Sequence, residues 1–170
     1  MRHRRGGAIV VRSGRPEDHS TLQRIFRRAS LSNPGDRAGL LARPGVLRLD
    51  DNLIGRGRTR VAALTDGKII GFASTSVGDR GALELDDLFV DPDWRRHGAA
   101  LRLVQQIAGE AADEQVVLIN VIANAHALEF YLAAGFESDV STRTPLGVGI
   151  RMHLDIARSG AFTADARHGG

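Results

Sequence analysis

Six consecutive residues combine cationic side chains with small ones, and the pattern suits anion binding: Arg95, Arg96, His97, Gly98, Ala99 and Ala100. Small residues let an anion approach backbone N–H groups closely. A helix that begins here directs its unpaired N–H donors and the positive end of its dipole at the same point. The segment could therefore hold a diphosphate without a metal ion. It would equally suit a tightly packed helix start without a ligand, and the loop alone does not separate these two interpretations.

The elements before this loop are predicted to be antiparallel strands. Thr59–Thr65 and Lys68–Ser76 are β-rich runs joined by Asp66-Gly67, a pair that predicts a two-residue hairpin turn with positive φ at both positions. A turn at Gly78–Gly81 leads to a third strand over Leu83–Val90. Apolar residues occupy positions 83 and 85 and then 88 and 90. This change of parity predicts a β-bulge, although a strand covered on both faces would explain it as well.

After the loop the apolar spacing becomes helical, with a predicted buried face formed by Ala100, Leu103, Val104, Ile107, Ala108 and Ala111. The nearly continuous apolar run Val116–Ile122 is typical of a strand covered on both faces. A right-handed crossover makes this strand parallel to Leu83–Val90. Asn124 is placed to cap a further helix that ends at Gly135, and its predicted apolar face consists of Leu128, Tyr131 and Leu132.

The remaining elements complete one domain. Ala8–Arg12 is a predicted first strand, and a helix that begins near Pro16 is broken at Asn33–Gly35. A short helix over Arg37–Ala42 follows, and Phe136–Thr142 and Val148–Ile156 form a last antiparallel pair. We predict a single domain over residues 8–157, a flexible basic tail at 1–7 and a flexible tail at 158–170.

Composition narrows the classes of function. The chain has 170 residues, 42% of them hydrophobic and 25% charged, which suits one compact domain. It has no cysteine, so disulfides and thiolate metal sites are excluded and a cytoplasmic location is expected. No apolar run approaches the roughly 20 residues that cross a bilayer, so we expect no membrane partner and no secretory signal. The net charge of +3 comes from dispersed arginines nearly balanced by acids, and we expect no nucleic-acid partner.

Three motifs occur in one order along the chain: Glu84–Pro92, the loop Arg95–Ala100, and Asn124–Phe136, which carries Ala127, Phe130, Tyr131 and Gly135. Together they closely resemble the GNAT superfamily of N-acetyltransferases, whose acetyl-CoA loop reads R/Q-x-x-G-x-G/A. The resemblance covers roughly residues 8–156. It implies an α+β fold with a mixed, mostly antiparallel sheet of about seven strands, flanked by about four helices.

The resemblance also implies a reaction, the transfer of an acetyl group from acetyl-CoA to a primary amine of a small molecule or peptide. The diphosphate would lie at Gly98 in the loop, where His97 either contacts phosphate or only fills space. A strand that splays from its neighbour would offer backbone donors to the thioester or the pantetheine amides at Leu88, Phe89 and Val90. Asn124 and Phe130 would complete the cofactor site, although capping and pantetheine binding compete for the one Asn124 side-chain oxygen.

Catalysis needs an acid for the leaving thiolate and a base for the substrate ammonium, whose pKa is well above 7. By the resemblance Tyr131 is the candidate acid, whereas its helical pattern alone would make it a core aromatic. Glu84 is the first candidate base, directly or through a water, and Asp87 and Asp86 are rivals. The three carboxylates could also form only a solvated acidic patch.

Some questions stay open at this level. The histidines show no ligand spacing with carboxylates, so no metal is expected. The amine would bind between residues 26–57 and the loop near Thr142–Gly149. A homodimer is the expected assembly. A non-catalytic acyl-CoA-binding or regulatory module on the same scaffold is the alternative function, because a fold alone does not decide activity.

Overall fold

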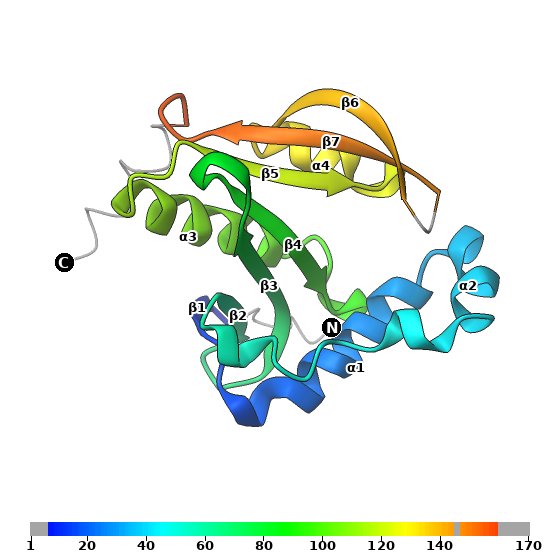
Figure 1. The fold of residues 1–170 in the computed structure, drawn as a ribbon. Coiled ribbons are helices and arrows are strands. Elements are labelled where there is room, and N and C mark those ends of the chain that lie inside the picture. The colour runs from blue at the N-terminus through cyan, green and yellow to red at the C-terminus, as the bar shows by residue number, and fades with distance from the viewer. Residues whose placement is uncertain (1–6, 145–146, 160–170) are drawn as a thin grey trace. The chain divides into compact units, whose positions relative to one another are not determined.

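A computed structural model of the chain describes residues 7–144 and 147–159, and Figure 1 shows the arrangement of its elements. Within these residues seven strands form one mixed sheet in the order β1-β2-β3-β4-β5-β7-β6. The strands are β1 (Ile9–Ser13), β2 (Thr59–Leu64), β3 (Ile69–Val77), β4 (Leu83–Val90), β5 (Leu118–Ala123), β6 (Glu137–Thr144) and β7 (Gly147–Asp155). The helices are α1 (His19–Leu31), α2 (Pro34–Leu41), α3 (Ala99–Asp113) and α4 (Leu128–Ala133). The predicted fold class is confirmed.

The pairing directions also agree with the sequence. β4 and β5 are parallel, whereas the β1–β2, β2–β3, β5–β7 and β6–β7 pairs are antiparallel. The chain divides into two compact units. The first unit contains the described residues up to Ser74 together with Asp87–Leu103, and the second contains Thr75–Asp86 together with those from Val104 onward. The predicted tails fall almost wholly outside the described residues, and the boundaries 8–157 stay a prediction.

The first unit has an apolar core between α1 and the strands. Leu22 and Ile25, three residues apart on α1, are fully buried with Val61 of β2 and Phe72 of β3. Each such side chain contributes about 1.5–3 kcal/mol when it leaves water. β1, β2 and β3 lie side by side (Figure 1). This core fixes α1 against the strands that lead to the candidate loop.

The β2–β3 turn differs from the prediction of two residues with positive φ. Gly67 has a φ of +91°, but Asp66 is not in the positive-φ region. The Leu64 N–H donates to the Lys68 carbonyl at 2.8 Å, and the Gly67 N–H donates to the Leu64 carbonyl at 2.9 Å. The loop therefore has three residues, a type I turn followed by one left-handed glycine. The Asp66 carboxylate accepts from the Lys68 N–H at 2.9 Å and so supports this longer turn.

Two details of the predicted burial are wrong. β5 is not covered on both faces, since Ile122 remains 50% exposed while its neighbours Val121 and Ala123 are buried. The outward face of β5 instead carries Asn120, which faces polar side chains of the neighbouring strands. On α4, Tyr131 is buried but Leu132 is 49% exposed. Tyr131 is the one buried residue of α4.

Helix starts also differ in part from expectation. Pro34 begins α2 instead of only ending α1, because proline without an N–H is tolerated in the first turn of a helix. At the start of α3, Ala99 is buried and Ala100 is only partly covered, so the inward face begins one residue earlier than predicted.

No helix among residues 7–144 and 147–159 has the length and apolar character that a membrane crossing needs.

Candidate active site

The backbone of the loop before α3 contains two residues with positive φ, a pattern that suits anion binding. Arg96 and Gly98 have φ values of +63° and +86°, and His97 between them does not. Alternation of this kind turns successive N–H groups toward one point. The first helical bond runs from the Arg102 N–H to the Gly98 carbonyl at 3.0 Å, so the N–H groups of the first turn have no acceptor within the helix. A Cβ at Gly98 would meet nothing within 4 Å, so φ, and not protein packing, requires the glycine here.

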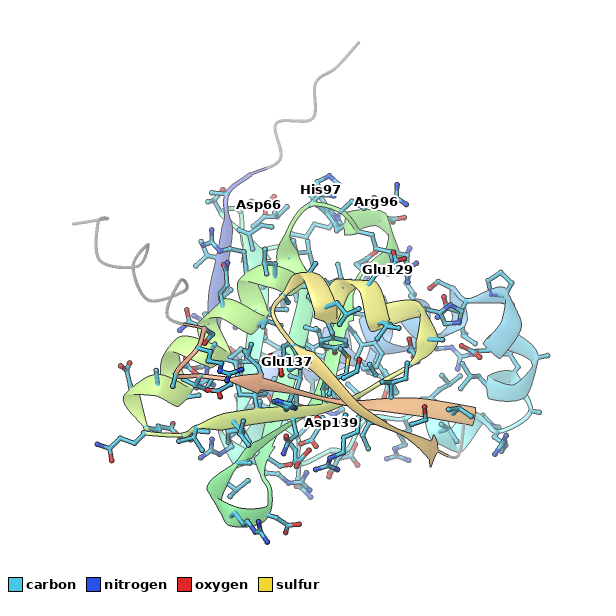
Figure 2. All side chains as sticks on the ribbon, turned by 90° about the horizontal axis from the view of Figure 1, so that it is seen from above. Asp66, Arg96, His97, Glu129, Glu137 and Asp139 are labelled. Atoms are coloured by element: carbon cyan, nitrogen blue, oxygen red, sulfur yellow. The ribbon has the colours of Figure 1, made fainter. Side chains whose placement is uncertain are left out.

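The side chains of the loop differ in exposure and in the hydrogen bonds they already make, and so in their ability to bind an anion. Arg96 and His97 project from the loop (Figure 2) and are exposed. The His97 Nδ1 lies 2.8 Å from the Arg95 carbonyl. Because a carbonyl only accepts, Nδ1 carries the hydrogen and Nε2 is left for a ligand. Arg95 itself donates to the Ser32 hydroxyl. Ala99 is only 2% exposed, so it can contribute its N–H but not its side chain.

β4 carries the remaining predicted cofactor residues of the first unit: Leu88, Phe89 and Val90. The Phe89 ring packs against Phe26 and Phe72, with ring centroids 4.8 Å and 5.8 Å away. Its side chain therefore serves the core, and only its backbone is available to a ligand. The residue pairs that join β4 to β5 run from Leu83↔Ile119 to Leu85↔Val121. The predicted bulge at Asp86 and Asp87 stays a prediction.

Gly71 on β3 explains how closely β3 and β4 approach each other. A Cβ at this position would lie 2.9 Å from the Phe89 carbonyl oxygen and 3.3 Å from the Val90 side chain. The backbone of β4 is thus held at the residues predicted to bind the cofactor by a contact that only glycine permits.

Glu84 lies in a polar row on the outward side of the second unit. Its Oε1 accepts from Asn120 Nδ2 at 3.1 Å, and Arg151 lies 3.7 Å from the same oxygen. The register aligns Glu84 with Asn120, and Asn120 with His153. A Cβ at Gly78 would lie 2.7 Å from the Glu84 Oε1, so the absence of a side chain there makes room for the carboxylate. Sequence reasoning missed Asn120 and Arg151, although a polar residue inside the apolar run 116–122 was a signal.

Asp87, the rival base, has a different environment in the first unit. It accepts a hydrogen bond from the hydroxyl of Ser74, a buried residue of β3. Asp86 is exposed. The structure thus places Glu84 with the second unit and Asp87 with the first, and each carboxylate already has partners that orient it.

Tyr131 is almost completely buried, with 6% of its surface exposed. Its ring lies edge-on between Phe130 and Phe136, at 5.2 Å from each. Burial raises the pKa of the Tyr131 phenol, because the phenolate is poorly solvated there. Among the described residues no fully buried side-chain N or O lacks a hydrogen-bond partner, and no partner of the Tyr131 hydroxyl is seen. The hydroxyl therefore keeps some accessible surface and remains protonated.

Asn124 resolves the expected competition for its side-chain oxygen. The Oδ1 atom accepts from the Ala127 N–H at 3.0 Å and caps the turn before α4, as predicted. The two N–H donors of the same amide stay available for a carbonyl acceptor. Capping and ligand binding are therefore compatible if Asn124 donates to the ligand.

The segment predicted to line the acceptor side is tied to α1 by a residue that sequence reasoning missed. The Gln23 amide donates to the Leu47 carbonyl at 2.6 Å and accepts from the Leu49 N–H at 2.8 Å. The second acceptor segment, 142–149, lies partly outside the described residues.

Among residues 7–144 and 147–159 no cluster of three or more metal-ligating side chains is found.

Comparison with protein families decides the relationship. The sequence model of the Acetyltransferase (GNAT) family matches residues 22–136, which include β4, the loop and α4. The chain belongs to the GNAT family. This family relationship supports acetyl transfer in general. No curated protein sequence matches the chain.

Solved structures with the same fold include three bacterial and archaeal acetyltransferases. The PaiA N-acetyltransferase of Thermoplasma acidophilum, in complex with coenzyme A, is 16% identical, with a TM-score of 0.70 over 87% of this chain and 99% of that one. The ribosomal-protein-S18-alanine N-acetyltransferase of Escherichia coli is 22% identical, with a TM-score of 0.64 over 88% and 94%. YncA of Salmonella typhimurium, with acetyl-CoA, is 16% identical, with a TM-score of 0.63 over 88% and 95%.

Proposed function

We propose that this GNAT protein transfers the acetyl group of acetyl-CoA to a primary amine of a small molecule or peptide. The observation that carries the proposal is the loop before α3. Its alternating positive φ values at Arg96 and Gly98 and its unpaired first-turn N–H groups suit a diphosphate. The GNAT structures of Thermoplasma acidophilum and Salmonella typhimurium hold coenzyme A and acetyl-CoA, which supports the same cosubstrate here.

The cofactor would be held by backbone more than by side chains. The N–H groups of His97, Gly98, Ala99 and Ala100 would face the diphosphate, with the Arg96 guanidinium beside it. Leu88, Phe89 and Val90 would offer backbone groups to the pantetheine arm, since the Phe89 ring is occupied in the core. The free Asn124 amide N–H groups would donate to a pantetheine carbonyl, and Phe130 would cover the arm.

The reaction would proceed in one ternary complex. The neutral amine attacks the thioester carbonyl, the C–N bond forms, and collapse of the tetrahedral intermediate breaks the C–S bond. Tyr131 gives its proton to the departing thiolate, a role for which its raised pKa keeps it protonated. Before the attack, the substrate ammonium passes one proton to Glu84, directly or through a water. After it, the attacking nitrogen returns a second proton to the Tyr131 phenolate, so that a neutral amide and a free thiol result. Asn120 orients the carboxylate and Arg151 can balance its charge.

The test of the acid assignment is Tyr131→Phe, which removes one hydroxyl and keeps the ring between Phe130 and Phe136. We expect kcat with a reactive amine to fall by about 10²-fold or more, with the Kd for acetyl-CoA unchanged. Unchanged turnover would eliminate Tyr131 as the acid. Glu84→Gln and Asp87→Asn, compared at saturating acetyl-CoA over a pH series, identify the base, since only loss of the base removes the acidic limb of the rate profile.

A further inference from the structure

The last turn of α1 and its C-terminal cap contact the cofactor loop through two side chains. Arg28 Nη1 lies 2.8 Å and 2.7 Å from the two carboxylate oxygens of Asp91, and its Nη2 lies 3.1 Å from Asp93. Four residues later, the Ser32 hydroxyl accepts from the Arg95 guanidinium. Residues 91, 93 and 95, which lead directly into the loop, are thus each contacted by α1 or its cap.

Asp91 is the central residue of this contact. Its side chain is only 7% exposed, and the one cation that the described contacts give it is Arg28. The same carboxylate accepts from the Asp93 N–H at 3.0 Å, while the Asp91 N–H donates to the Ile70 carbonyl at 2.8 Å. The Trp94 N–H donates to the Asp91 carbonyl at 2.8 Å. A buried carboxylate with this many bonds sets the direction in which the chain leaves β4.

From these contacts we infer that Arg28 is a positioning residue for the diphosphate loop, acting through Asp91 and Asp93. An ionised carboxylate as buried as that of Asp91 requires a cation, and the guanidinium contacts both Asp91 oxygens through Nη1 while its Nη2 reaches Asp93. The hydrogen bonds of Arg28 go to Asp91 and Asp93, and not to the loop N–H groups or Gly98. Arg28 therefore acts by fixing the segment that leads to Arg95. The inference rests on the proposed function, because it needs the loop to bind the diphosphate.

Acetyl-CoA and acetyl-pantetheine separate this role from a general loss of structure. Acetyl-pantetheine has the same thioester and amides but lacks the diphosphate. If Arg28 positions the diphosphate loop, Arg28→Met should raise the Kd for acetyl-CoA by about tenfold and leave acetyl-pantetheine binding within twofold. Arg24→Met is the matched control, because Arg24 is also an exposed arginine of α1 and makes no hydrogen bond or ion pair with the described residues.

Calorimetric titration of the two ligands into wild type, Arg28→Met, Arg28→Lys and Arg24→Met performs the test, with urea unfolding in parallel. Arg28→Lys should recover only part of the acetyl-CoA affinity, because its single nitrogen can replace the Nη1 contact to Asp91 but not also the Nη2 contact to Asp93. Equal losses for both ligands, or none in Arg28→Met, would overturn the inference. A wild type that binds both ligands equally tightly would instead overturn the diphosphate assignment of the proposed function.

Discussion

Replacing Gly98 with alanine tests whether the loop backbone binds the cofactor. Gly98 has a φ of +86°, and a Cβ there would meet no protein atom within 4 Å. The cost to folding is therefore conformational alone, about 1–2 kcal/mol for a non-glycine residue in the left-handed region. That cost would appear in urea unfolding as a modest loss of stability.

The effect of Gly98→Ala on cofactor binding should be larger than its effect on folding. The open space beside Gly98 is where the proposed diphosphate approaches, and a methyl group there would separate the phosphate oxygens from the N–H donors. Loss of two such charge-assisted hydrogen bonds at about 1.5–3 kcal/mol each predicts a Kd for coenzyme A at least 10²-fold higher. Calorimetric titration of coenzyme A measures it directly.

Gly109→Ala is the matched control for this change. Gly109 lies within α3, and a Cβ there also meets nothing within 4 Å. Alanine should stabilise that helix by about 0.5–1 kcal/mol and leave the Kd unchanged. A Gly98→Ala protein that folds and binds coenzyme A within twofold of wild type would refute the backbone cradle.

Two further changes test the polar groups. Gly78→Ala would place a Cβ 2.7 Å from the Glu84 Oε1 and 2.8 Å from its Cγ, so the Glu84 side chain must take another rotamer and we expect a fall in kcat similar to that of Glu84→Gln. Equal activity of Gly78→Ala and wild type would show that the observed carboxylate position is not needed. Asp18→Asn tests a structural ion pair, since the hydrogen bond from Arg12 lowers the Asp18 pKa. Because the pKa of Asp18 is lower in the folded than in the unfolded chain, the ion pair stabilises the fold fully at pH values above the unfolded pKa, near 4. This stability is lost as the pH falls through the folded pKa. Asp18→Asn should therefore be about 1–3 kcal/mol less stable at pH 7, measured by urea unfolding. This deficit should shrink in acid, and a deficit that is constant with pH would contradict the ion-pair account.

Local signals in the sequence predicted the elements well. The strand Leu83–Val90 has the bounds that apolar residues and turns predict, and Asn124 caps the turn before α4 as its residue type suggests. The β2–β3 hairpin was placed correctly, but its turn has three residues, because an Asp-Gly pair is compatible with more than one loop length. Pro34 is ambiguous in a similar way, because a proline that ends one helix can also be the first residue of the next.

The contacts that position the candidate site were not visible in the sequence. Arg28 and Asp91 lie 63 positions apart, and Glu84 and Asn120 lie 36 apart. Such pairs depend on how α1 rests on the core and on the strand register, and neither is encoded in a local pattern. The three GNAT motifs supplied the candidate residues themselves, while the structure supplied their partners.

The proposed reaction moves an acetyl group from acetyl-CoA to an amine. The most direct measurement incubates the purified protein with acetyl-CoA and a panel of small amines and peptides. It follows free thiol by absorbance and the acceptor by mass spectrometry. The account predicts thiol release that depends on one class of amine, matched mole for mole by an acceptor carrying one acetyl group. Tight binding of acetyl-CoA with no amine-dependent thiol release across the panel would contradict it and identify a non-catalytic acyl-CoA-binding protein.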